Sequence, residues 1–304
     1  MSRTLLMGSP ATHWRERLDE MLDDRPLLVA DPMDPNRGTP GRVALYRGSR
    51  CIAWRFVGAL DVARNPMAVL QGIALLLAEA GEDVVVQLFV ARATALHRQL
   101  AVACAQLIAP TEILVPEDFA LPLEGWPVGP QRVTCEPSFP RMVQTAQRRA
   151  RWLELLEHCH DHTVAWREVS LQGARLGSGL PVDATIRQAL GASVVYAELA
   201  GKTLVTLGKD APPEESVARA LDLARAERWV ALDPGLFSGR LCAFARADGE
   251  PFGLGIIEEM DVESGTFLVR CTAIPPVPVR ILTLGTLRLD AQGRELADDA
   301  AWAV

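Results

Sequence analysis

Short apolar runs alternate with segments of helical period in the first part of the chain. The expected strands are Thr4–Met7, Leu27–Ala30, Val43–Tyr46, Ile52–Val57, Val84–Val90 and Glu112–Val115. Between them, apolar residues three or four positions apart predict helices from Trp14 to Leu22, from Pro66 to Ala80 and from Thr94 to Ile108. Strands that alternate with helices in this way indicate a mainly parallel sheet covered by helices, an α/β fold.

The pattern changes after a proline-rich connection that runs from Pro116 to Pro140. A helix is expected from Arg141 to about His158, and short strands with tight turns follow from Val164 onward. The later elements expected are hairpins at 194–207 and 241–259, a helix at 214–226, and strands at 229–232, 267–272 and 281–289. We therefore predict an α/β domain at 1–130, a lid or linker helix region at 131–163, and a smaller α+β domain at 164–304.

Composition narrows the class of protein. The 304 residues are 49% hydrophobic and carry a net charge of −7, which disfavours a generally basic nucleic-acid binder but leaves room for a local basic patch. The six cysteines are scattered without a C-x-x-C pair, so neither a zinc ribbon nor a disulfide framework is indicated. No signal peptide or bilayer-spanning apolar run is present, and a cytoplasmic location is expected.

The start of the chain has the element order of a P-loop nucleotide-binding domain: a strand, a turn that opens with Gly8, a helix and a second strand. A P-loop needs G-x-x-x-x-G-K-[ST], because backbone N–H groups surround the phosphates, the lysine reaches them and the hydroxyl holds Mg²⁺. Here Gly8 is present, but His13-Trp14-Arg15 stands where Gly-Lys-Ser is required.

Two interpretations of this segment remain open. In one, it is a residual anion site, in which the phosphate-binding residues are Gly8, Ser9, Thr12, His13 and Arg15. In the other, it is a vestigial turn in which Trp14 fills the former nucleotide pocket.

Two further groups of residues are candidates for chemistry. Asp31 and Asp34 lie in a loop rich in Pro, Gly and Asp, where they are either a general base or metal ligand, or ordinary turn residues. The segment from Arg141 to Trp152 has four arginines and no acid. Its arginines, Arg141, Arg148, Arg149 and Arg151, either contact phosphates or form a solvated helix face.

A pair of histidines, His158 and His162, would share one face if the helix continued that far, as zinc ligands can. No other Cys or His pair stands at ligand spacing. A helix end rich in histidine is the simpler interpretation, so no metal site is predicted.

Taken in order, these segments resemble the P-loop polynucleotide 5′-hydroxyl kinase family of RNA-end processing, which includes the messenger-RNA cleavage-complex kinase and ribosomal-RNA processing kinases. The Asp31 loop, with Gly38, Pro40 and Gly41, is similar to the family's D-x-D-x-G-Q…G-x-P-G segment. Phe56-Val57-Gly58 is similar to its F-V-G motif, and 141–151 to its arginine-rich lid. The last third, through 281–289, follows its C-terminal domain. The resemblance implies a degenerate, bacterial-like member without the additional N-terminal β domain.

The family's catalytic residues are replaced in this sequence. By the resemblance, Trp14 stands at the Walker lysine, Arg15 at the Mg²⁺-binding hydroxyl, and Gln87-Leu88 at the Walker-B-like Asp-Thr. Asp31 alone remains, as a possible base. The leading hypothesis is a catalytically degenerate kinase-like protein that needs no cofactor and binds an RNA or DNA 5′ end or a protein partner. The alternatives are an active 5′-kinase that uses ATP and Mg²⁺, with Arg15 on phosphate and Asp31 as base, and a structural subunit that pairs with a competent relative.

Overall fold

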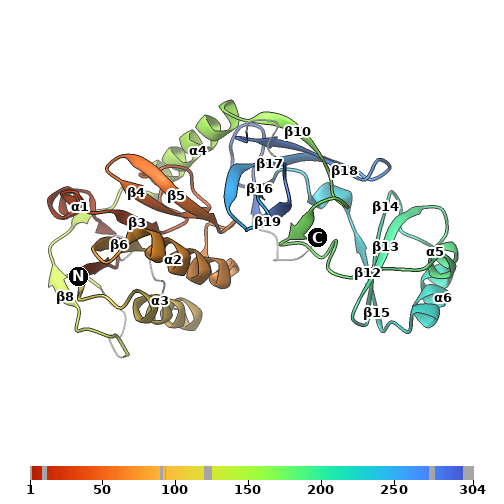
Figure 1. Cartoon of the computed structure of the whole chain (residues 1–304), viewed down its shortest axis with the longest axis horizontal. Coiled ribbons are helices and arrows are strands. Elements are labelled where there is room, and N and C mark those ends of the chain that lie inside the picture. Colours follow the sequence, from red (N-terminus) through yellow and green to blue (C-terminus); the bar gives the residue numbers. More distant parts are fainter. Residues whose placement is uncertain are drawn as a thin grey trace. The chain divides into compact units, whose positions relative to one another are not determined.

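The computed structural model describes residues 2–8, 12–89, 92, 94–119, 125–273 and 278–296. The chain forms two compact units, Met1–Leu153 and Glu154–Val304, each with its own hydrophobic core (Figure 1). The division into domains at 1–130, 131–163 and 164–304 stays a prediction. Within the part of the chain that the structure describes, no helix is both long enough and apolar enough to cross a bilayer.

A seven-stranded sheet forms the centre of the first unit, in the order β5-β4-β3-β6-β1-β7-β8. Its strands are β1 (Arg3–Leu6), β3 (Leu27–Ala30), β4 (Arg42–Arg47), β5 (Arg50–Phe56), β6 (Val84–Leu88), β7 (Glu112–Pro116) and β8 (Gln131–Val133). Strands β3, β6, β1, β7 and β8 run parallel, and β4 and β5 add an antiparallel hairpin at one edge. The α/β fold class predicted from the sequence is confirmed.

Helices cover both faces of this sheet. Successive residues of a strand point to opposite faces and therefore belong to two different apolar cores. Leu5 and Leu28 pack in the core formed with α2 (Pro66–Ala80) and α3 (Ala95–Ile108). Leu6 and Leu27 belong to the core beneath α1 (Arg15–Leu22). Because β3, β6, β1, β7 and β8 run parallel, their carboxyl ends, and the loops that follow them, lie at one edge of the sheet.

Two sheets build the second unit. The six-stranded sheet has the order β10-β18-β17-β16-β19-β11 and consists of β10 (His160–Ala165), β11 (Ser170–Gln172), β16 (Arg240–Ala245), β17 (Pro251–Asp261), β18 (Thr266–Cys271) and β19 (Ile281–Arg288). The four-stranded sheet consists of β12 (Leu180–Pro181), β13 (Val194–Ala200), β14 (Thr203–Gly208) and β15 (Arg228–Leu232). Helices α5 (Ala184–Leu190) and α6 (Glu214–Ala224) pack on this smaller sheet (Figure 1).

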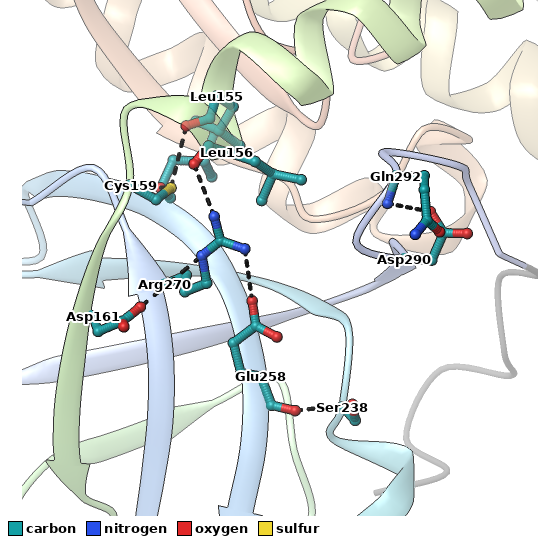
Figure 2. Close-up of polar contacts among 10 residues, drawn as sticks. Leu155, Leu156, Cys159, Asp161, Ser238, Glu258, Arg270, Asp290 and Gln292 are labelled. Carbon is teal, nitrogen blue, oxygen red and sulfur yellow. Dashed lines mark hydrogen bonds and ion pairs between the residues drawn. The ribbon is translucent and has the colours of Figure 1, made fainter.

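One helix, α4 (Arg141–Glu157), belongs to both units, and Arg270 of β18 holds its C-terminal end. The Arg270 guanidinium donates to the carbonyl of Leu156 at 3.1 Å and pairs with the Glu258 carboxylate at 3.1 Å. Figure 2 shows both contacts as dashed lines. The thiol of Cys159 donates to the carbonyl of Leu155 at 3.3 Å. Side chains thus satisfy carbonyls that the helix end leaves without intrahelical partners.

The two histidines weighed as a metal pair do not share a helix. α4 ends at Glu157, and β10 begins at His160. Nδ1 of His158 lies 2.7 Å from the carbonyl oxygen of Glu154, and Nε2 of His162 donates to the carbonyl of Ala273 at 3.0 Å. The helical spacing on which the metal interpretation depended is therefore not formed.

Candidate functional site

The segment after β1 lies at the carboxyl edge of the first sheet, where parallel α/β folds bind ligands. Gly8 is buried directly after the strand, and Ser9 lies outside the described residues. Thr12–His13 form a short strand, β2, which pairs antiparallel with β9 (Glu136–Pro137). Arg15 opens α1 and is exposed. The chain is therefore extended just before the helix, where a P-loop would curve around phosphates.

Trp14 fills the space beneath the start of α1. Its side chain is only 5% exposed and packs in the core with Leu6, Leu18 and Leu114. The residue stands at the N-cap position of α1, but its indole cannot accept from the helix amides, and no side-chain cap is formed. A bulky apolar side chain thus takes the position that the family resemblance assigns to the phosphate-binding lysine.

The first turn of α1 receives an internal carboxylate. The backbone N–H of Glu16 donates to Oε1 of Glu136 at 2.8 Å. Because helix N-termini carry unsatisfied amides and partial positive charge, they attract anions. Glu136, which lies in the proline-rich connection, supplies that negative charge from within the chain. Sequence reasoning missed this residue, since only the β2–β9 pairing brings it to the helix.

Asp31 follows β3 at the same edge and is half-buried. Its Oδ1 accepts from the backbone N–H of Met33 at 3.0 Å. Burial, and to a smaller extent the nearby charge of Asp34, raise the pKa of Asp31 to about 7, although the Met33 N–H and the Arg148 cation act in the opposite direction. A carboxyl group with a pKa near neutrality is able to exchange a proton at physiological pH.

Asp34 is buried and fully engaged in holding its own loop. Its Oδ1 accepts from the backbone N–H and the side-chain Nδ2 of Asn36, both at 2.8 Å, and its Oδ2 accepts from Nε2 of Gln87 at 3.2 Å. In the sheet register, Gln87 of β6 stands opposite Leu6 of β1 and Val29 of β3. The side chain of Gln87 therefore ties β6 to the loop that carries Asp31 and Asp34.

The lid arginines divide between two sides of α4. Arg148 is buried with 8% exposure, and its charge acts on Asp31. Arg151 donates from Nε to the carbonyl of Pro35 at 3.2 Å. Arg141 and Arg149 are exposed. Two of the four arginines thus contact or face the protein's own Asp31 loop, and two lie toward solvent.

A second polar cluster at this edge was not predicted. Nε2 of His97 lies 3.1 Å from Oδ1 of Asp61, and Nδ1 of His97 lies 2.8 Å from the hydroxyl of Thr94. The hydroxyl also accepts from the backbone N–H of His97 at 3.3 Å, which caps α3. Asp61 accepts from Arg92 at 2.9 Å. The cluster fastens the start of α3 to the loop after β5, and a Thr-x-x-His cap was its only sequence signal.

The residues at this edge do not match the donor set of a Mg²⁺-nucleotide site. Mg²⁺ in such sites is held by carboxylate and hydroxyl oxygens next to the phosphates. By the family resemblance, Trp14, Arg15 and Gln87 stand at those positions. Asp34 accepts hydrogen bonds from Asn36 and Gln87. Among the described residues, no cluster of three or more His, Cys, Asp or Glu side chains is arranged to bind a metal ion.

No protein-family model matches the sequence, and no curated protein matches it either. Solved structures do match. One is a Pcf11p–Clp1p complex, described by its extended interface and by the structural basis for ATP loss in a glycine-to-arginine point mutant. It aligns with a TM-score of 0.55 and 10% sequence identity, and the alignment covers 94% of this chain and 74% of that chain. The wild-type Clp1p–Pcf11p complex aligns with a TM-score of 0.52, 10% identity and the same coverage. Nearly the whole chain is therefore similar in fold to Clp1p, a P-loop polynucleotide kinase family protein.

Proposed function

We propose that this chain is a polynucleotide 5′-kinase-like protein that has lost ATP-dependent phosphoryl transfer and acts by binding. The observation that carries the proposal is the 2.8 Å hydrogen bond from the Glu16 N–H to the Glu136 carboxylate. A P-loop protein offers the amides of this helix start to phosphate. A carboxylate held there competes with phosphate for the same donors and repels it.

Two further features support this loss. Trp14 is packed in the core beneath α1, so a lysine-like contact to phosphate is missing at that position. Gln87 brings no charge to attract Mg²⁺, and it is already committed to Asp34.

The solved neighbours suggest what such a protein would bind. Clp1p is found in complex with Pcf11p, and one of these structures is described by the structural basis for ATP loss in a glycine-to-arginine point mutant. By analogy, we propose that this chain binds a protein partner or a nucleic-acid 5′ end in RNA or DNA end processing.

The second candidate is an active ATP-dependent polynucleotide 5′-hydroxyl kinase, and Asp31 is the observation that favours it. A pKa of about 7 suits a general base that accepts the proton of an attacking 5′ hydroxyl. Arg15, exposed at the start of α1, would then hold phosphate in place of lysine.

A calorimetric titration with Mg-ATP separates the two candidates, together with an assay of γ-phosphate transfer to 5′-hydroxyl RNA and DNA oligonucleotides. The binding-only proposal predicts neither saturable ATP binding nor transfer. Saturable binding with transfer that is abolished by Asp31→Asn, but kept by the exposed control Asp24→Asn, would establish the kinase instead.

A further inference from the structure

The buried ring of His97 is held at both of its nitrogens. Nδ1 lies 2.8 Å from the hydroxyl oxygen of Thr94, and Nε2 lies 3.1 Å from Oδ1 of Asp61. The ring also packs edge-on against Phe89, with the two ring centroids 6.4 Å apart, and His97 is only 4% exposed. The cap of α3 requires only the Thr94 hydroxyl and the His97 backbone N–H, so it accounts for neither of the two ring contacts.

The contacts of Asp61 assign the hydrogen on the imidazole ring. The Asp61 carboxylate accepts from the backbone N–H of Ala63 at 3.0 Å and pairs with Arg92 at 2.9 Å. A carboxylate only accepts hydrogen bonds, so Nε2 of His97 is the nitrogen that carries hydrogen. In the neutral ring Nδ1 is then an acceptor, and the Thr94 hydroxyl donates to it. A hydroxyl, a base and a carboxylate that orients the base are thus bonded in series, which is the arrangement that activates nucleophiles in covalent catalysis.

The Thr94 hydroxyl is accessible and lies beside unpaired helix amides. Thr94 is exposed, whereas the His97 ring behind it is buried. One lone pair of the hydroxyl oxygen accepts from the His97 N–H at 3.3 Å, which leaves the other for attack on a substrate. The N–H groups of Ala95 and Leu96, in the first turn of α3, have no hydrogen-bond partner among the described residues. Such amides stabilise the negative oxygen that forms when a hydroxyl adds to a carbonyl group.

We propose that Thr94 is the nucleophile of an esterase site, in which His97 is the general base and Asp61 orients the ring. Attack of Thr94 Oγ1 on a carboxylic ester forms an O–C bond while the hydroxyl proton moves to Nδ1 of His97. The tetrahedral adduct then breaks its bond to the alcohol, which takes that proton and leaves an acyl ester on Thr94. Water attacks this ester, His97 takes the proton of the water and passes it to the departing Thr94 oxygen, and the carboxylic acid is released.

The test is the hydrolysis of para-nitrophenyl acetate by the full chain, followed through the released nitrophenolate and by mass spectrometry of the acid-quenched protein. We expect turnover above the rate in buffer and an acetyl group on Thr94. Thr94→Asn should lower the rate at least about tenfold and abolish the adduct, because asparagine still caps α3 but has no hydroxyl. Thr94→Ser, which has both the cap and the hydroxyl, should restore the adduct.

Two further variants locate the base and control for the surface. His97→Gln should lower the rate of acetylation of Thr94 at least about tenfold, because no base then accepts the hydroxyl proton. Thr111→Val, at another exposed threonine of the first unit, should leave the rate and the adduct unchanged. Circular dichroism and the thermal midpoint verify that each variant is folded.

Three results would overturn the inference. They are a wild-type rate no higher than that of Thr94→Asn, an acetyl group that appears on other residues but not on Thr94, and an unchanged rate of Thr94 acetylation in His97→Gln. All three are independent of the Mg-ATP titration, because no nucleotide takes part in ester hydrolysis. The esterase site and the proposed loss of phosphoryl transfer can therefore each fail while the other holds.

Discussion

At the scale of single residues, Asp31 connects the candidate site with the stability of the protein. The unfolded chain releases the Asp31 proton near pH 3.8, whereas the folded chain holds it until about pH 7. Between these values the folded state binds the proton and the unfolded state does not. The contribution of Asp31 to the free energy of unfolding therefore falls as pH rises from about 4 to about 7, and it is constant above that.

Asp31→Asn should remove this loss. We expect the free energy of unfolding of the variant, minus that of the wild type, to be about 1–2 kcal/mol larger at pH 8 than at pH 4. This value is smaller than the full shift in pKa would give, because the Asp31 side chain is half-buried. Urea unfolding of both proteins across this pH range measures the gain. Asp24→Asn removes an equal charge from an exposed turn and serves as the control. An identical pH profile for the two variants would contradict the raised pKa.

Trp14 yields a second prediction at this scale. Trp14→Lys restores the residue that the family resemblance expects, but it places an ammonium group in an apolar core and removes the indole contacts. We expect a loss of at least about 3 kcal/mol in the free energy of unfolding and no gain of ATP binding. The neighbouring Arg15→Ser, at an exposed position, should stay within about 0.5 kcal/mol. A stable Trp14→Lys protein that binds Mg-ATP would show instead that the pocket can reopen.

At the scale of elements, the bounds of a helix or strand could be predicted where the capping residues or the apolar pattern are strong. α2 begins and ends where the sequence predicts, because Asn65 caps it through the Ala68 N–H, Pro66 fits the first turn, and Gly81 ends it at φ 86°. The strand Leu27–Ala30 is also reproduced, since four consecutive apolar residues suit a strand covered on both faces.

Features that depend on contacts between distant residues were not predictable. The two-residue strands β2 and β9 are too short to show a period, so the Glu136–Glu16 contact had no sequence signal. The bond between Gln87 and Asp34 joins residues 53 positions apart. Helix α5 was missed although Asp183 caps it by accepting from the Ile186 N–H; seven residues are too few for a clear helical pattern.

The close approach of β17 and β18 provides the prediction at this scale. A Cβ atom added to Gly255 would lie 2.6 Å from the Cα of Cys271, its partner in register. Backbone cannot move aside in the middle of a six-stranded sheet, so Gly255→Ala should cost more than about 3 kcal/mol. Gly129→Ala, where nothing lies within 4 Å of the added atom, should be nearly neutral. Equal midpoints in thermal unfolding would refute the close packing.

At the scale of the whole molecule, the six cysteines are free thiols in surroundings that disfavour the thiolate form. Three are buried and three are half-buried. Burial raises the pKa of every thiol, to about 12 for Cys104 and Cys271 and to about 11 for Cys159. Because the thiolate is the reactive form, we expect slow labelling by a thiol reagent at pH 8 in the native protein. In denaturant without reductant, all six should react. Fewer than six would reveal a disulfide.

The helix shared by the two units limits how the protein can be divided. The boundary after Leu153 falls within α4, four residues before the helix ends at Glu157. A recombinant fragment that starts at Glu154 would retain a single turn, too short to remain helical by itself, and the Leu156 carbonyl would no longer be positioned for Arg270. A fragment that stops at Leu153 would lose the last turn of the same helix. Separate expression of either half therefore requires that both fragments carry all of α4, so that the two pieces overlap in sequence.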